Sequence, residues 1–255
     1  AMGWPVPVYG HLPLINGPDG AKLSKRHGAL AVEAYRDMGY LPETMRNYLL
    51  RLGWSHGDDE IIPTAQAIAW FNLDSIGKSA ARMDYKKLDN LNGHYIREAD
   101  DARLAGLVAP RIAALTGRPV EADREALLVR AMPALKPRAK TLDEIADGAL
   151  FLFAQRPLVP DDKAMALLDV AGLDLIAACV GALSGIETWT PESIEERIRG
   201  VAETAELGLG KVAQPLRAAL TGRTTSPGIF DTLFLLGKEE ALARLSDAAA
   251  LGVHG

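Results

Sequence analysis

Three cationic side chains lie close together near the start of the chain. Lys22, Lys25 and Arg26 fall within residues 17–29, which read GPDGAKLSKRHGA. The flanking glycines allow the backbone to take positive φ and to approach a ligand closely. Two lysines three residues apart on such a loop could hold a polyphosphate, because ammonium groups stabilise negative charge that shifts during a reaction. The alternative from the residues alone is a basic turn that only faces water.

Two further groups of cationic side chains lie on or near segments that we predict to be helical. In the first group, Lys86, Lys87 and Arg97 lie in and just after a helix predicted at residues 85–92, and a solvated helix face is the simpler interpretation. The second group is spread over a helix pair and its connecting turn, and consists of Lys211, Arg217, Arg223 and Lys238. Arginine offers a planar fork of donors that can both stack and hydrogen-bond. Nearby acidic residues could equally balance these charges at the surface.

No other catalytic set emerges from the sequence. The five histidines and the single cysteine show no zinc-ligand spacing. A G-x-S-x-G nucleophile motif and a Walker-type loop are both absent. Paired acidic residues fall at turns or helix starts, where capping explains them. We therefore predict no metal site in this chain.

The bulk composition excludes several classes of protein. The 255 residues are 48% hydrophobic and carry a formal charge of -5, which argues against a strongly basic nucleic-acid binder. A local basic face could still bind RNA. The single cysteine, Cys179, allows no intrachain disulfide, lies in an apolar run that predicts a buried thiol, and fits the reducing cytoplasm. No apolar run is long enough to span a bilayer, so we expect no membrane partner.

Helices are the elements expected to position the cations. Aromatic residues make up only 6% of the chain, whereas alanine and leucine are abundant, and this balance predicts a mostly α fold. Asp84, Asp100 and Thr190 are predicted to cap helices, since their side chains can accept hydrogen bonds from free amides of the first turn. Gly93 and Gly117 are predicted to end helices.

Three further details of the helices are predicted from local pattern. Thr64 is expected to cap a helix that turns Ile68 and Phe71 inward. Pro133 is expected to break the helix before it, because proline removes a hydrogen-bond donor and clashes with the preceding turn. Ser226, followed by a proline, is expected to begin another helix.

The loop Lys22-Leu23-Ser24-Lys25-Arg26 resembles the signature loop of class I aminoacyl-tRNA synthetases, in the form used by the glutamyl branch. The resemblance continues through residues 40–60 and 84–97, with the segments YLPE, LGWS, GDDE, DYKKL and LNGHYIR. Residues 211–239, with KVAQPLRAALTGR and SPGIF, resemble the C-terminal anticodon-binding domain of bacterial glutamyl-tRNA synthetases.

The resemblance covers nearly the whole chain but only about the C-terminal half of such an enzyme. It implies a remnant of the catalytic region with the loop at residues 1–30, and a helical stem-contact domain at residues 31–97. Two all-helical anticodon-binding subdomains would follow at residues 98–156 and 157–255. The upstream nucleotide-binding fold has no counterpart in this sequence. We therefore expect the chain alone to bind tRNA but not to catalyse.

The resemblance also implies a reaction and roles for the loop. The whole enzyme would use ATP with Mg²⁺ to activate L-glutamate, and would attach it to the tRNA for glutamate. Lys25 would stabilise the pyrophosphate leaving group and Lys22 would support the loop, so both would be catalytic. The ATP-binding residues would be Lys22, Leu23, Ser24, Lys25 and Arg26. No cofactor is expected to bind tightly to this chain alone, and we expect a cytoplasmic monomer.

The later cations would contact the tRNA if the resemblance holds. Lys86, Lys87 and Arg97 would lie beside the sugar-phosphate backbone, where contacts place a protein on RNA without reading its sequence. Lys211, Arg217, Arg223 and Lys238 would lie near anticodon bases, which are open to stacking and hydrogen bonding.

Two alternatives stay open at this point. Within the family, the chain could belong to a paralogue that charges the glutamine tRNA, because the sequence does not show which arginine faces the third anticodon base. Outside enzymes, it could be a non-catalytic tRNA-binding module or a helical interaction module. Salt-dependent affinity for tRNA would separate these last two.

Overall fold

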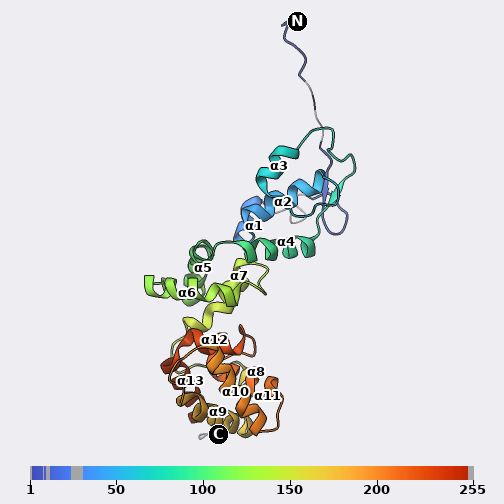
Figure 1. Cartoon of the computed structure of the whole chain (residues 1–255). Helices are drawn as coiled ribbons and strands as arrows, with labels where there is room; N and C mark the ends of the chain where they lie inside the picture. The colour runs from blue at the N-terminus through green and yellow to red at the C-terminus, as the bar shows by residue number, and fades with distance from the viewer. Residues whose placement is uncertain (1, 8, 10–11, 24–30, 252–255) are drawn as a thin grey trace. The chain divides into compact units, whose positions relative to one another are not determined.

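The structure is a computed structural model that describes residues 2–7, 9, 12–23 and 31–251. Ser24, Lys25 and Arg26 of the predicted loop lie outside the described residues. The described chain is mostly helical, as predicted (Figure 1). It divides into two compact units, residues 1–99 with 138–142 and residues 100–137 with 143–255. The finer division into four segments stays a prediction.

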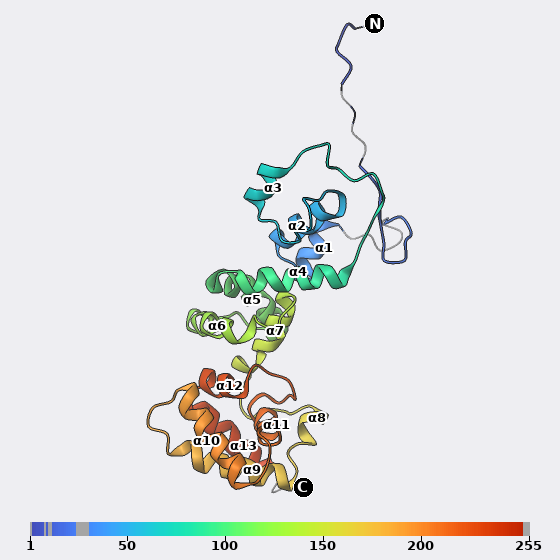
Figure 2. The same ribbon diagram turned by 45° about the vertical axis from the view of Figure 1, so that its right-hand side comes forward.

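The first unit packs short helices against one longer helix. Its elements are β1 (Ile15–Asn16), α1 (Val32–Asp37), α2 (Pro42–Gly53), α3 (Thr64–Trp70), β2 (Ala81–Arg82) and α4 (Tyr85–Glu98). The two strands pair in parallel, with Ile15 opposite Ala81. Figures 1 and 2 show α1, α2 and α3 on the same side of α4. The core between them consists of Tyr35, Tyr40, Met45, Tyr48, Met83 and Leu88.

All regular elements in the described part of the second unit are helices (Figure 2). Its elements are α5 (Asp101–Thr116), α6 (Ala122–Leu135), α7 (Leu142–Ala149, whose first residue belongs to the first unit), η2 (Leu150–Leu152), α8 (Asp162–Met165), α9 (Val170–Ser184), α10 (Pro191–Thr204), α11 (Leu209–Thr221), α12 (Ile229–Leu236) and α13 (Lys238–Leu251). An apolar core of this unit includes Ile176, Leu183, Ile194, Ile198, Leu216 and Leu233, all fully buried. None of the described helices is both long and apolar enough to cross a lipid bilayer.

The three predicted capping side chains do cap helices. The Asp84 carboxylate accepts from the Lys87 amide at 3.1 Å. At the next helix, Asp100 accepts from the Arg103 amide at 2.8 Å. Thr190 begins α10 in a capping box with Ser193. Gly117 ends α5 with a φ of 70°, a left-handed conformation that favours glycine, so this prediction is also confirmed.

Gly93 does not end α4, so that prediction is wrong. The helix continues through it to Glu98. A Cβ atom at Gly93 would lie 3.2 Å from the carbonyl oxygen of Ala139 and 3.8 Å from the Cα atom of Lys140. The glycine therefore lets a distant backbone segment approach the helix closely. A local pattern cannot separate this use of glycine from a helix end.

Both predictions for α3 are wrong as well. Pro63, and not Thr64, stands at the cap position of this helix, and its apolar side chains do not turn inward. Ile68 is 77% exposed and Phe71 is 46% exposed. Trp70 stacks on His56 instead, with ring centroids 3.9 Å apart and planes 11° apart. Because each helical residue is rotated by about 100° from the preceding one, Trp70 and Ile68 point in nearly opposite directions, and the stacking of Trp70 on His56 leaves Ile68 in solvent.

Pro133 does not break α6, which runs on to Leu135. The proline removes one backbone hydrogen bond from the last turn. Met132 is fully buried and Leu135 is 6% exposed, so packing holds this turn in place. Tertiary contacts here outweigh the local preference of proline.

A buried amide connects four segments of the first unit. The Oδ1 atom of Asn92 accepts from the Leu41 amide at 2.9 Å and from the Thr44 hydroxyl at 2.8 Å. Its Nδ2 atom donates to the carbonyl oxygens of Gly39, at 3.2 Å, and Lys140, at 2.6 Å. Asn92 is fully buried, and these four bonds use both donors and both acceptor sites of its amide. They attach α4 to the start of α2 and to residues 138–142.

A buried arginine connects segments of the second unit, as Asn92 does in the first. Arg244 is 3% exposed, and its Nε atom donates to Glu240 at 2.6 Å. One terminal nitrogen donates to the carbonyl oxygens of Phe151 and Leu220, each at 2.8 Å. Burial lowers the pKa of Arg244 from its ordinary value. Carbonyls at helix ends lack donors within their own helix, so this side chain joins α13 to η2 and to the end of α11.

We expect Asn92→Ala to lower the free energy of unfolding by about 2–4 kcal/mol, because it leaves several buried polar groups unpaired. Urea unfolding followed by circular dichroism measures the change. The matched control is Asn90→Ala, at an exposed position of the same helix, where we expect a change within about 0.5 kcal/mol. Equal effects of the two substitutions would contradict the role assigned to Asn92.

We also expect Cys179 to resist alkylation in the native protein. It is fully buried, and burial raises the pKa of its thiol to about 12, whereas the reactive species is the thiolate. The raised pKa means that the folded protein favours the neutral thiol. Cys179 therefore contributes to the free energy of unfolding below the ordinary thiol pKa of about 8.5, and this contribution is lost as the pH rises toward the folded-state pKa. Mass spectrometry after iodoacetamide treatment should show modification only in denaturant. Rapid modification of the native chain would contradict this assignment.

Candidate nucleic-acid interface

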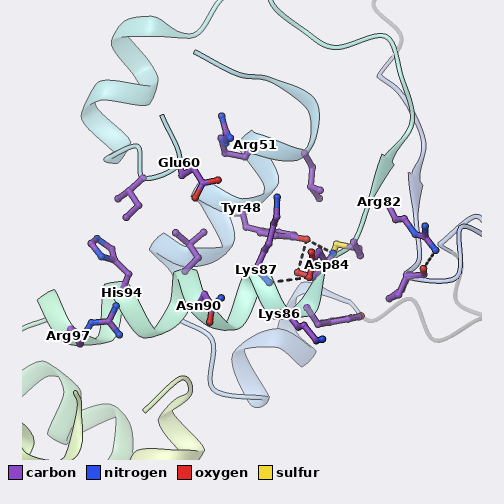
Figure 3. Close-up of a pocket in the computed structure, with 16 residues that line it drawn as sticks. Tyr48, Arg51, Glu60, Arg82, Asp84, Lys86, Lys87, Asn90, His94 and Arg97 are labelled. Carbon is purple, nitrogen blue, oxygen red and sulfur yellow. Dashed lines mark hydrogen bonds between the residues drawn. The ribbon is translucent and has the colours of Figure 1, made fainter. Parts of the chain in front are cut away.

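A cavity of about 930 Å³ opens in the first unit, between α2 and α4 (Figure 3). Pro18, residues of the loop after α2, and β2 complete its walls. Seven charged side chains line it: the cations Arg51, Arg82, Lys86, Lys87 and Arg97 and the carboxylates Glu60 and Asp84. The cavity is therefore locally positive, although the whole chain carries a formal charge of -5.

Helix α4 presents its cations because its other face is buried. Leu88, Asn92, Gly93 and Ile96 form the buried face. The helical repeat of about 3.6 residues then leaves the exposed face to the polar residues Lys86, Lys87, Asn90 and Arg97. The same packing that fixes the helix thus sets the direction of its charges.

Tyr48 holds the start of α4 in place. Its hydroxyl group accepts from the Asp84 amide at 2.7 Å and donates to the Asp84 carbonyl oxygen at 3.1 Å. Burial raises the pKa of Tyr48, so the hydroxyl group remains a neutral donor and acceptor. The Asp84 carboxylate is itself bound to the Lys87 amide. One of the two acids of the cavity therefore serves the helix end, where the helix dipole favours a negative charge.

The predicted cations of α4 are available for a ligand. Among the described residues, Lys86, Lys87 and Arg97 have side chains with no hydrogen bond or ion pair. His94, which also lines the cavity, lies 3.2 Å from Glu98 through its Nε2 atom. Figure 3 shows Lys86, Asn90, His94 and Arg97 along one helix. Unpaired ammonium and guanidinium groups in a row suit a phosphate backbone.

Only the start of the predicted ATP-binding loop is described. Lys22 is exposed, and its backbone forms an isolated bridge with Asn16. The Leu23 amide donates to the Ile15 carbonyl oxygen at 3.0 Å. The chain thus enters the loop beside β1. The catalytic and ATP-binding roles of these residues stay predictions.

Two of the later predicted cations have partners within the second unit. The Arg217 Nε atom donates to the Ser226 hydroxyl group at 2.8 Å. Ser226 does not cap α12, contrary to the prediction, because Gly228 stands at the cap position. Arg223 forms an ion pair with Asp147 at 2.6 Å.

Of the other two predicted cations, Lys238 has hydrogen-bond partners and Lys211 is exposed. The Lys238 ammonium group donates to the carbonyl oxygens of Ser184, at 2.8 Å, and Ile186, at 2.7 Å, and thereby binds the end of α9. Lys211 is exposed on the first turn of α11. The structure therefore places the predicted tRNA contacts in two groups, one in each unit. Their contacts with RNA stay predictions.

Sequence reasoning missed Arg51 and Arg82 as members of the cavity. Arg51 lies at the end of α2, three residues after Tyr48, and so on the same face of that helix. This spacing was the available signal, but it becomes informative only once α4 is known to lie opposite. The position of Arg82 in the cavity wall depends on the pairing of β2 with β1, which is a contact between distant segments.

Within the described ranges, no three histidine, cysteine, aspartate or glutamate side chains come close enough together to hold a metal ion. We assign no Mg²⁺ ligand to this part of the chain.

Two family models match the chain. Residues 103–249, more than half of its length, match an anticodon binding domain. Residues 1–90 match the catalytic domain of class I tRNA synthetases of the E and Q type.

Similar proteins carry consistent names. The chain is 66% identical over 253 residues to glutamate–tRNA ligase 1 of Sphingopyxis alaskensis, covering 98% of this chain and 51% of that protein. It is 62% identical over 252 residues to glutamate–tRNA ligase 2 of Rhodospirillum centenum, covering 99% and 54%. The chain spans about half the length of the curated relatives it matches.

A solved structure agrees with this similarity. The crystal structure of a glutamate tRNA ligase from Elizabethkingia meningosepticum, in complex with its amino acid, has a TM-score of 0.81 and 30% sequence identity. The match covers 98% of this chain and 52% of that one. Because the anticodon binding domain model covers more than half of its length, the chain belongs to the anticodon binding domain family, and it is similar over nearly its whole length to the glutamate–tRNA ligases.

Proposed function

We propose that the chain is the tRNA-binding part of an enzyme that uses ATP to attach L-glutamate to its tRNA. The names of the similar proteins support the reaction. The match of residues 103–249 to an anticodon binding domain supports tRNA as the partner. The cationic cavity of the first unit is the observation on which the proposal rests most directly, because its lysines and arginines suit a phosphate backbone.

The roles of the loop near the start belong to the same proposal. Lys25 stabilises the pyrophosphate leaving group, and Lys22 supports the loop that covers ATP. The match of residues 1–90 to a class I catalytic domain supports this assignment. Mg²⁺ accompanies ATP in the whole enzyme, with ligands that we do not assign. The proposed setting is the cytoplasm, where translation takes place, and the proposed state is a monomer.

The proposed contacts with tRNA divide between the two units. Lys86, Lys87 and Arg97 contact the sugar-phosphate backbone, which positions the RNA without reading its sequence. The later cations lie near unstacked anticodon bases. Whether the whole enzyme prefers the glutamate or the glutamine tRNA is decided by an aminoacylation assay on both.

We expect the double variant Lys86→Ala/Lys87→Ala to bind a glutamate tRNA more weakly than the unchanged chain. Each lysine that leaves a phosphate contact lowers the dependence of log affinity on log salt by about one unit, so the slope should fall by about two. Fluorescence anisotropy at several salt concentrations measures both the affinity and the slope.

The control for this experiment is Arg36→Ala, which removes an exposed cation of the first unit that does not line the cavity. Its affinity and salt slope should match those of the unchanged chain. Binding of the double variant with an unchanged slope would contradict the proposed interface, and so would an unchanged chain with no affinity for tRNA at low salt.

A further inference from the structure

Arg51 is the least satisfied cation of the cavity. Its terminal nitrogen Nη1 is buried and has no hydrogen-bond partner among the described residues. A buried donor without a partner costs free energy, on the order of 1–3 kcal/mol and more when the group is charged. An unpaired buried group of this kind is expected where a ligand supplies its missing hydrogen-bond partner.

Comparable arginines elsewhere in the described chain have acceptors. Arg244 binds Glu240 and three backbone carbonyls. Arg124 donates to the Leu152 carbonyl oxygen at 3.1 Å. Arg156 forms two parallel bonds to Asp247, at 2.7 and 2.8 Å. Against this background, the missing partner of Arg51 points to a ligand.

The surroundings of Arg51 show which ligand would suit it. Figure 3 shows Arg51 and Glu60 across the cavity from Lys86, Asn90 and Arg97. Glu60 is the acid on the same side as Arg51, and the described contacts include no ion pair between them. The cations of the opposite wall are unpaired as well, so an anionic ligand would meet positive charge on both sides.

We propose that Arg51 binds a phosphodiester group of the tRNA backbone, from the wall of the cavity opposite α4. A strand in the cavity is then held from two sides, by Arg51 and by the lysines of the helix. The planar guanidinium group matches two oxygens of one phosphate. Since no described residue accepts a hydrogen bond from Nη1, this nitrogen can turn toward a ligand in the cavity without losing a hydrogen bond. This inference rests on the proposed function.

The test uses Arg51→Met, which keeps the apolar stem and removes the charge. We expect tRNA affinity to fall by about tenfold or more, and the salt slope to fall by about one. The melting temperature should stay the same or rise, because an unpaired buried donor is removed. Arg51→Lys should restore the slope but only part of the affinity, since an ammonium group cannot bind two oxygens in a plane.

Arg46→Met is the matched control, because Arg46 is an exposed arginine of the same helix outside the cavity. It should bind tRNA as the unchanged chain does. If Arg51→Met binds tRNA as this control does while Lys86→Ala/Lys87→Ala binds weakly, the inference fails and the proposed function stands. If the unchanged chain does not bind tRNA, the proposed function itself fails.

A free polyphosphate is the other source of the same chemistry. Inorganic pyrophosphate, added alone, should not raise the melting temperature of the unchanged chain more than that of Arg51→Met. A selective effect of pyrophosphate, with equal tRNA affinities of the two chains, would overturn the assignment to the RNA backbone. A large fall in the melting temperature of Arg51→Met would show that Arg51 stabilises the fold, and would also overturn it.

Discussion

The buried amide of Asn92 is the constraint on which the first unit depends. Its four hydrogen bonds reach the turn at Gly39, the start of α2 and the carbonyl oxygen of Lys140. Gly93, the next residue, allows residues 138–142 to approach α4 closely. With one face of the helix held in this way, the opposite face is free to carry charge. The stability of the unit and the direction of its cations therefore have the same origin.

Charge is distributed unevenly for a physical reason. The whole chain carries a formal charge of -5, yet five cationic side chains and two carboxylates line the cavity between α2 and α4. Cations of the second unit such as Lys238 and Arg244 donate to backbone carbonyls and hold helix ends. Cations of the cavity such as Lys86 and Arg51 have no such partner among the described residues. The charges of these cavity cations are thus not neutralised by described residues and remain able to attract an anion.

Several features followed from local chemistry and could be predicted. Asp84, Asp100 and Thr190 cap helices because a short polar side chain at the start of a helix can accept a hydrogen bond from a free amide of the first turn. The mostly α fold and the helical position of Lys86 and Lys87 were also predictable. Arg97 joins them on α4 only because the helix continues past Gly93, which was not predicted. Other features depended on partners far along the chain, and local patterns could not supply them.

By itself the sequence determined the class of fold, the caps of several helices and the charges available to a ligand, because these depend on neighbouring residues. Only the tertiary structure decided that Gly93 lies inside a helix, that Ile68 faces solvent and that Arg51 joins the cavity. Each of these outcomes depends on a second segment: residues 138–142 for the glycine, His56 for the turn of α3, and α4 for the arginine. Contacts between distant segments, which local periodicity does not encode, built the site from charges already present.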